Sequence, residues 1–311
     1  MNRILSALAA CALVTASSPA ADYAIHSFSK QHLDKHYWSE GANFGDLNRD
    51  GKADAICGPY WWEGPTFEKR HEIYPPTTTF KLKQKDGSEK TIPGFVGALG
   101  NRNAYSIDNF FAFAHDFNAD GWNDVLTYGL PHTPAYLYLN PKGKGGHWAR
   151  HTVLEQVDNE SPTFADINGD GKPEIICNNG GNFGYAEPDW KNPTKPWKFH
   201  AITEKGNWQR YTHGLGIGDV NGDGRQDFLF KSGWLEQPAK KDGKWTMHPA
   251  MFSPGGGAQM YAYDVNGDGR NDVITSIAAH GYGLAWHEQL AKKDKNGHAT
   301  FKMHIFMNKE R

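Results

Sequence analysis

The sequence has little cysteine, little net charge and, beyond its first twenty residues, no long hydrophobic run. Its 311 residues include 3 cysteines, and 35 acidic against 33 basic side chains leave a net charge of −2. Without a basic tract, binding to nucleic acid or to an anionic membrane is not expected. Because no later stretch is apolar for roughly 18 residues, we expect no transmembrane segment either.

The one apolar run lies at the N-terminus and has the features of a secretory signal peptide. A basic residue precedes the apolar residues 4–16, and small residues lead to a cleavage position at Ala20. We therefore expect a signal peptide over residues 1–20 and a secreted or periplasmic mature chain, residues 21–311. The residues before Cys11 also resemble a lipoprotein signal, but the apolar run continues past this cysteine, so ordinary cleavage is favoured over a lipid anchor.

What the sequence does contain is an acidic nine-residue loop that occurs five times. Side-chain oxygens stand at positions 1, 3, 5 and 9, and a glycine at position 6 allows a sharp turn. Ca²⁺ takes six or more oxygen ligands, and a backbone carbonyl at position 7 supplies another. We expect about one Ca²⁺ per loop, with metal-free Asx turns as the alternative. The expected ligands are Asp46, Asn48, Asp50 and Asp54; Asp116, Asn118, Asp120 and Asp124; Asp166, Asn168, Asp170 and Glu174; Asp219, Asn221, Asp223 and Asp227; and Asp264, Asn266, Asp268 and Asp272.

These loops are not EF-hands. An EF-hand needs a bidentate Glu at position 12 between two helices, whereas position 12 here is Cys, Thr or Phe and the flanks are β-branched and aromatic. The loops are therefore expected to join strands. Glu174 replaces Asp at position 9 of the third loop, and its longer side chain is expected to change the fit there.

A larger repeat surrounds each loop. A short apolar strand precedes the loop, a second strand follows it, a third carries an aromatic residue, and a fourth has the pattern aromatic-x-x-His, as in Trp245–His248. Successive loops begin 45 to 70 residues apart, and no stretch keeps a helical period. This pattern predicts an all-β fold, a β-propeller of four-stranded blades with five blades visible. Residues 78–109 are expected to be an insertion containing a hairpin that turns at Asp86-Gly87.

The outer strands outnumber the loops. Aromatic-x-x-His strands run from Tyr23–His26 to Phe301–His304, which gives six outer strands for five loops. Either one terminal strand is redundant or further blades are missing, and we favour the second, an open or strained ring that a partner chain completes. Cys57 and Cys177 occupy equivalent places in non-adjacent repeats, so they are expected to be buried thiols and not a disulfide.

The loops, including Gly218 to Gly224 and Phe44-Gly45-Asp46, resemble those of FG-GAP/VCBS repeat proteins. The resemblance covers nearly the whole mature chain and implies a propeller whose blades carry Ca²⁺, as in integrin head domains. It says little about function, because adhesion proteins, polysaccharide lyases and other secreted bacterial proteins share the repeat. More loosely, the chain is similar to the propeller part of the aldos-2-ulose dehydratases, whose cupin domains are absent from this sequence.

Three functions are compatible with these patterns, and whether the chain is an enzyme stays open. The first is a carbohydrate- or protein-binding module, in which Trp61, Trp62, Trp234 and Trp286 stack on sugar rings or, alternatively, pack between blades. The second is a sugar lyase or dehydratase. The third is a structural module of a larger secreted assembly.

A candidate catalytic or metal site lies six positions before the first acid of three loops, at Glu40, Glu160 and His213. These residues are expected to begin the innermost strands of their blades at one mouth of the central channel. Two carboxylates and a histidine there can bind a transition metal or act as a general acid and a general base. Asn109 and Gln259 are the expected polar neighbours. The alternative is a solvated rim.

Overall fold

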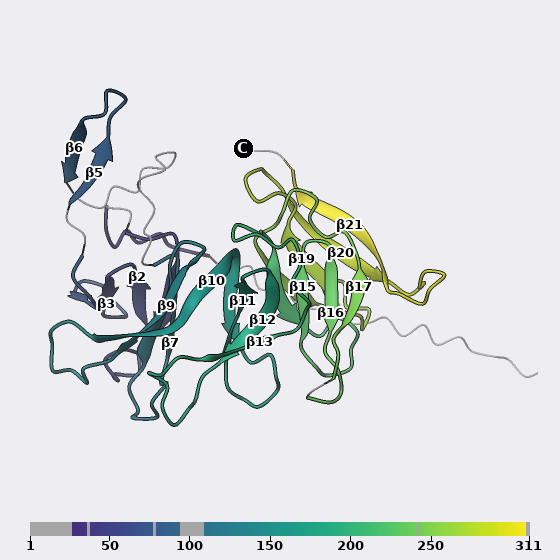
Figure 1. The fold of residues 1–311 in the computed structure, drawn as a ribbon, viewed down its shortest axis with the longest axis horizontal. Coiled ribbons are helices and arrows are strands. Elements are labelled where there is room, and N and C mark those ends of the chain that lie inside the picture. Colours follow the sequence, from purple (N-terminus) through teal and green to yellow (C-terminus); the bar gives the residue numbers. More distant parts are fainter. Residues whose placement is uncertain (1–26, 36–37, 77–78, 94–108, 242, 309–311) are drawn as a thin grey trace, which may run out of the picture. The chain divides into compact units, whose positions relative to one another are not determined.

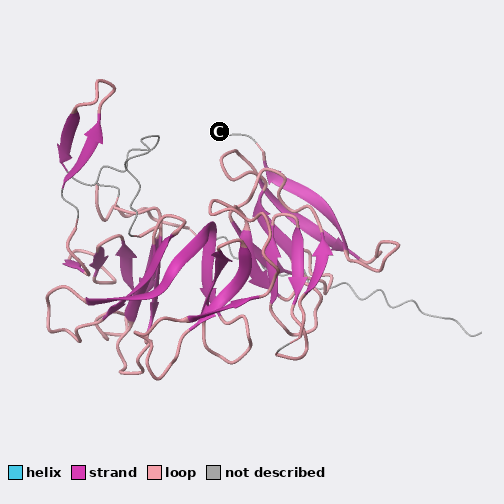
Figure 2. Ribbon diagram, viewed as in Figure 1, coloured by secondary structure: helices cyan, strands magenta, loops and turns pink. Residues whose placement is uncertain are grey.

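The computed structural model describes residues 27–35, 38–76, 79–93, 109–241 and 243–308. Within these ranges the chain consists of strands and loops without a helix (Figure 2), so the all-β prediction is confirmed. The expected signal peptide, Cys11 and the expected strand at residues 23–26 lie outside the described ranges. No helix that could span a membrane was found among the described residues.

Each acidic loop joins the first two strands of a four-stranded antiparallel meander, which we call a repeat. The described residues form five of them. Repeat 1 is β1 (Ala42–Gly45), β2 (Asp54–Cys57), β3 (Tyr60–Trp62) and β4 (Arg70–Glu72); repeat 2 is β7 (Phe111–His115), β8 (Asp124–Tyr128), β9 (Thr133–Leu139) and the first part of β10 (Ala149–Ala165); repeat 3 is the rest of β10, β11 (Glu174–Asn179), β12 (Asn182–Glu187) and β13 (Lys198–Ala201); repeat 4 is β14 (Leu215–Gly218), β15 (Asp227–Phe230), β16 (Gly233–Glu236) and β17 (Thr246–Pro249); repeat 5 is β18 (Gln259–Tyr263), β19 (Asp272–Ser276), β20 (Leu284–Leu290) and β21 (Thr300–Met307).

Repeats 2 and 3 share one strand. β10 is 17 residues long (Figure 1). It pairs with β9 as far as Val157 and with β11 from Asp158 onward, so the outer strand of repeat 2 runs directly into the inner strand of repeat 3. The two repeats therefore form one seven-stranded sheet.

Repeats 4 and 5 join in a different way, because their inner strands β14 and β18 pair in parallel. The backbones approach closely at Gly216, where a Cβ atom would lie 1.8 Å from the carbonyl oxygen of Met260. Only glycine fits at such a contact. The result is an eight-stranded sheet.

The hydrophobic core lies between consecutive repeats. Trp61 of repeat 1 packs with Val125 of repeat 2, and Trp234 of repeat 4 packs with Val273 of repeat 5. Fully burying one such side chain contributes about 1.5–3 kcal/mol, so these junctions account for much of the stability. The outer faces of the first and last repeats differ from these buried junctions because they are exposed to solvent. On these faces Phe44, Tyr261 and Tyr263 are 61%, 59% and 65% exposed.

The expected hairpin is present as β5 (Thr79–Lys83) and β6 (Glu89–Pro93), which form a separate two-stranded sheet with Gly87 in the turn. Of the expected polar segment that follows it, only Asn109 lies in the described ranges. The two cysteines in the described ranges are free thiols as expected, although Cys57 is half-buried whereas Cys177 is fully buried.

Candidate functional site

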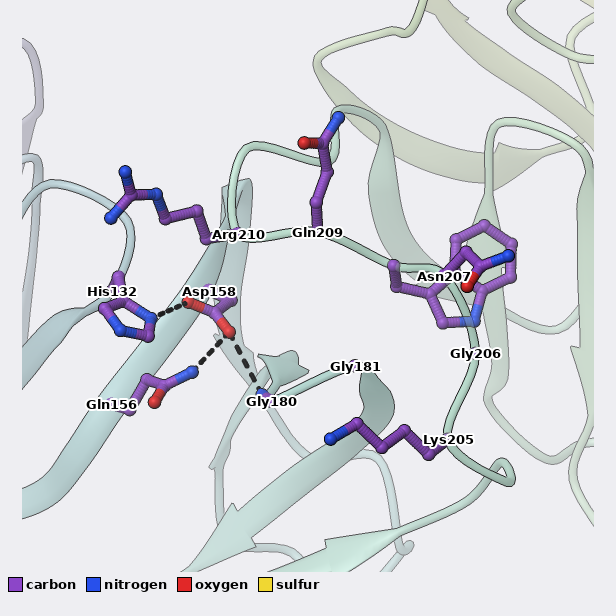
Figure 3. A pocket seen from close by; sticks show the side chains of 11 residues that line it. His132, Gln156, Asp158, Gly180, Gly181, Lys205, Gly206, Asn207, Gln209 and Arg210 are labelled. Carbon is purple, nitrogen blue, oxygen red and sulfur yellow. Dashed lines mark hydrogen bonds and ion pairs between the residues drawn. The ribbon is translucent and has the colours of Figure 1, made fainter.

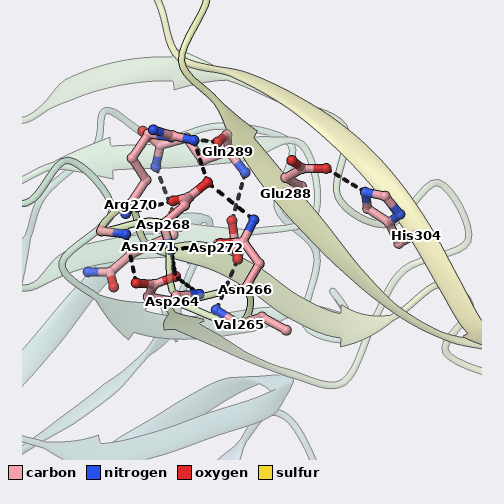
Figure 4. A network of polar contacts seen from close by, with 12 residues as sticks. Asp264, Val265, Asn266, Asp268, Arg270, Asn271, Asp272, Glu288, Gln289 and His304 are labelled. Carbon is pink, nitrogen blue, oxygen red and sulfur yellow. Dashed lines mark hydrogen bonds and ion pairs between the residues drawn. The ribbon is translucent and has the colours of Figure 1, made fainter. Parts of the chain in front are cut away.

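The acidic loops are ordered by bonds from their own backbone amides to side-chain oxygens. In the fifth loop the carboxylate of Asp264 accepts hydrogen bonds from the amides of Gly267 and Gly269, and the side-chain oxygen of Asn266 accepts one from Asp268 (Figure 4). The first acid of each other loop accepts the equivalent bond from the glycine at position 6. These glycines have φ between 79° and 86°, in the left-handed region that glycine favours.

The acid at position 9 is buried and connects three parts of its repeat. Asp227 accepts bonds from the amide of Val220 at 2.9 Å and from the amide of Gln237 at 3.0 Å. It therefore ties the start of the loop to the end of the third strand. Asp54, Asp124 and Asp272 make the equivalent pair of bonds in their own repeats.

The third loop departs from this arrangement. Glu174 accepts a bond from the amide of Ile167, but its second oxygen accepts the side-chain amide of Asn168 at 3.0 Å. In the first, fourth and fifth loops the equivalent asparagine donates to the acid at position 5 instead. The extra methylene of Glu174 thus changes how the loop's own groups pair, while its effect on metal binding stays a prediction.

Burial favours the neutral form of three of the position-9 acids. It raises the pKa of Asp124 and Asp227 to about 7 and that of Glu174 to about 8, and the acids at positions 1 and 5 act in the same direction. In the fourth and fifth loops an arginine at position 7 offsets part of this negative charge, since Arg225 contacts Asp223 and Arg270 contacts Asp268.

The donor set fits a hard cation. In the fifth loop the carboxylates of Asp264, Asp268 and Asp272 gather with the amide of Asn266 (Figure 4). A carboxylate oxygen has two lone pairs, so one that accepts an amide hydrogen can also take a metal ion. Oxygen ligands of this kind suit Ca²⁺ better than softer metals. Calcium binding by the loops stays a prediction.

The candidate residues at the starts of the inner strands come together in part. Glu160 Oε2 lies 3.4 Å from His213 Nδ1, and the ring of His280 meets that of His213 edge to face with centroids 4.7 Å apart. Burial raises the pKa of the Glu160 carboxyl. The charge of His280 lowers this pKa and the charge of Glu40 raises it, so Glu40 lies within electrostatic range of Glu160. Burial, followed by the charge of His280, lowers the pKa of His213.

His280 was not expected from the sequence, because it lies in the β19–β20 connection and belongs to no repeated pattern. Of the two expected polar neighbours, Asn109 has a structural contact of its side chain, whereas Gln259 has one of its backbone. The side chain of Asn109 donates to the carbonyl of Gly58, and the carbonyl of Gln259 accepts a bond from Thr275.

The repeated aromatic residues mostly serve the core. Trp61, Trp62 and Trp234 are buried, so their faces are not free to stack on a sugar, whereas Trp286 in repeat 5 is half-buried. Each of Trp61, Trp234 and Trp286 stacks on the histidine of the fourth strand, which bonds in turn to a glutamate two residues after the tryptophan. The aromatic-x-x-His strands are thus structural, as expected.

One cavity of about 440 Å³, which we call the tryptophan pocket, lies beside the first two acidic loops. Its walls include Asn48 of the first loop and Trp122 at position 7 of the second loop. Two histidine–glutamate pairs add polar groups, with His71 2.8 Å from Glu63 and His147 2.8 Å from Glu72. The remaining lining residues include Trp61, Trp148 and Asn140.

A second cavity, of about 540 Å³, is more basic (Figure 3). Its lining includes Lys205, Arg210 and His132 around the buried carboxylate of Asp158. Asp158 lies 3.3 Å from His132 Nδ1 and accepts the amide of Gly180 at 3.0 Å, so it fixes the wall of this cavity. Neither cavity could be predicted from the sequence, because their walls come from segments far apart in the chain.

Several solved structures are similar to this chain at low identity. An Agrocybe aegerita lectin, described as recognising non-reducing terminal N-acetylglucosamine, is 16% identical with a TM-score of 0.45, over 86% of this chain and 66% of its own. The rhamnogalacturonan lyase YesW is 15% identical with a TM-score of 0.44, over 87% and 55%. The Vibrio cholerae biofilm matrix protein Bap1 is 16% identical with a TM-score of 0.38, over 85% and 38%.

The chain thus spans less than two thirds of the length of these proteins. No curated protein matched the sequence. The family model for an FG-GAP-like repeat matches residues 116–177, which include the second and third acidic loops. The chain therefore carries an FG-GAP-like repeat, as its loops predicted.

Proposed function

We propose that this chain is a secreted calcium-binding β-propeller module that binds carbohydrate in the tryptophan pocket. The observation that carries the proposal is the composition of this pocket, which combines the half-buried indole of Trp122 with carboxylates and histidines beside two acidic loops. Aromatic faces contact the apolar side of a sugar ring, and carboxylates accept bonds from its hydroxyl groups. A cavity of about 440 Å³ is in the size range of small-molecule sites.

Calcium and sugar binding are coupled in this proposal. Asn48 is a loop ligand that also lines the pocket, and Trp122 extends from the loop of repeat 2. The guanidinium of Arg49 lies 5.6 Å from the Trp122 ring centroid, so residues of both loops hold this indole in place. Ordering of the loops by Ca²⁺ would set the position of the indole.

The propeller arrangement is part of the same proposal. Five repeats with cores at their junctions suit blades around a channel. The exposed Phe44 lies on a face whose equivalents in later repeats are covered by the preceding repeat, and Tyr261 and Tyr263 lie on a face whose equivalents in earlier repeats are covered by the following repeat. This exposure supports an open ring completed by a partner chain. A protein ligand on such a face is the alternative to a glycan.

Binding of the calcium-loaded protein to a glycan array tests the proposal. We expect sugar binding that chelation abolishes and that Trp122→Ala weakens. Trp190→Ala is the matched control, because Trp190 is also half-buried and has a cation, Lys172, over its ring, but lies outside the pocket. Equal binding by both variants would exclude the tryptophan pocket as the site.

A second candidate function is a sugar lyase or dehydratase that uses Glu160 and His213 as acid and base, since these two groups lie 3.4 Å apart. Such an enzyme would create a double bond in a polysaccharide digest. Loss of that product in Glu160→Gln would support it, and absence of any new double bond with the parent protein would exclude it.

A further inference from the structure

Glu160, His213 and His280 form a cluster that is separate in composition from the acidic loops and the tryptophan pocket. One ligand atom from each lies within 4.8 Å of the other two. Glu160 and His213 stand six residues before Asp166 and Asp219, so each is at the opposite end of its inner strand from the acidic loop.

We propose that these three side chains bind one Zn²⁺ ion. Two imidazoles and one carboxylate are a donor set that Zn²⁺ takes, whereas Ca²⁺ prefers oxygen ligands throughout. Ligands of a tetrahedral Zn²⁺ at about 2.0–2.1 Å lie about 3.3 Å from one another. The 3.4 Å between Glu160 Oε2 and His213 Nδ1 already matches that spacing.

The backbone holds the three ligand-bearing segments together. The amide of Glu160 donates to the carbonyl of Thr212, next to His213, at 3.0 Å. A Cβ atom on Gly256 would lie 2.9 Å from Cβ of His213, and Gly255 exchanges backbone bonds with Ile277 and Ala279, which lead to His280. Closing the site on a metal therefore needs only rotation of side chains.

The exposure of the cluster leaves a position for an external ligand. The side chains of Glu160 and His213 are 20% and 19% exposed, while His280 is exposed. Glu40 adds negative charge near Glu160, which favours a cation, and Lys231 opposes it near His213. Three protein ligands with a fourth position open to solvent is the arrangement of zinc sites that bind water or a substrate oxygen.

The test is titration of the full chain with Zn²⁺ by calorimetry, in an excess of Ca²⁺ that keeps the acidic loops saturated. We expect one tight site per chain. Substituting a residue that only orients a metal ligand commonly lowers the metal affinity by about 10–100-fold. Removing a ligand should cost at least as much, so His280→Ala and Glu160→Gln should weaken Zn²⁺ binding by about 100-fold or more. Cobalt(II) gives a second readout, because its visible absorption depends on the ligands.

His32→Ala is the control, since His32 is exposed and lies outside both the cluster and the tryptophan pocket. It should bind Zn²⁺ like the parent. All variants should keep the parent's calcium-dependent melting temperature, which separates loss of this site from loss of the loops. Zinc binding unchanged in His280→Ala and Glu160→Gln, or no binding by the parent, would overturn the proposal.

Discussion

The indole of Trp234 stacks on the imidazole of His248, with ring centroids 4.1 Å apart and planes 12° from parallel. Nε2 of His248 lies 2.7 Å from Oε2 of Glu236, so the indole and the carboxylate together fix the position of the imidazole. Trp61 with His71, Tyr185 with His200 and Trp286 with His304 repeat this stack in other repeats.

Removing the buried indole should destabilise the protein strongly. We expect Trp234→Ala to lower the free energy of unfolding by about 3–5 kcal/mol, because it leaves a cavity at the junction of repeats 4 and 5. Trp286→Ala should cost clearly less, since Trp286 is half-buried. Urea denaturation followed by fluorescence measures both, and equal losses would show that Trp286 is also covered in solution.

Calcium should stabilise the folded chain. A metal ion that binds only the folded loops raises stability by mass action, so chelation should lower the melting temperature and added Ca²⁺ should restore it. Asp219→Ala should remove part of this effect. Glu174→Asp, which restores the common ligand of the third loop, should preserve or increase it. A melting curve that chelator leaves unchanged would contradict calcium binding by the loops.

The calcium-free protein should lose stability as the pH rises. The pKa values of Asp124 and Asp227, about 7 when folded, lie above the ordinary 3.8, and Glu174 is raised to about 8. An acid whose pKa is higher in the folded state favours folding while protonated, so this stability is present at low pH and disappears between about pH 4 and 8. Urea denaturation at several pH values, after removal of calcium, measures the slope.

Asp227→Asn should reduce this slope, whereas Asp189→Asn, at an acid that is exposed, should leave it unchanged between pH 5 and 8. Saturating Ca²⁺ should flatten the dependence for the parent. A calcium-free protein that becomes more stable from pH 5 to 8 would show that these acids are ionised in the folded state.

Gly216→Ala should weaken the junction of repeats 4 and 5. An added Cβ atom would meet the carbonyl of Met260 at 1.8 Å, so β14 and β18 must separate. We expect a loss of stability above 1 kcal/mol, more than the few tenths typical of a tolerated change. Gly222→Ala is an informative comparison, because nothing lies within 4 Å of a Cβ there and only its positive φ is strained. Faster hydrogen exchange of the β14 and β18 amides in Gly216→Ala alone would locate the effect.

The sequence was informative where structure is local. The spacing of acids in a loop such as Asp219–Asp227, and the β-branched and aromatic residues beside it, are local signals, and they predicted strand–loop–strand units correctly. Equivalent positions in successive repeats also placed Glu160 near His213.

Other features depend on contacts between repeats and have no local signal. The continuity of β10 follows from pairing on both sides of one strand, which residues 149–165 alone do not reveal. His280 reaches the cluster because the segment around Ala278 bridges to Gly255, a long-range contact with no motif. The tryptophan pocket likewise needs Trp122 and His71 from neighbouring repeats.

The sharing of β10 has a consequence for how the chain comes apart. A strand that pairs with β9 over one half and with β11 over the other cannot leave one sheet without loosening the other. Repeats 2 and 3 should therefore open as a single cooperative unit in native-state hydrogen exchange. The four described strands of repeat 1 form a sheet of their own and share no strand with repeat 2, although the two repeats share a core. Repeat 1 should therefore open at a lower free energy than the unit of repeats 2 and 3.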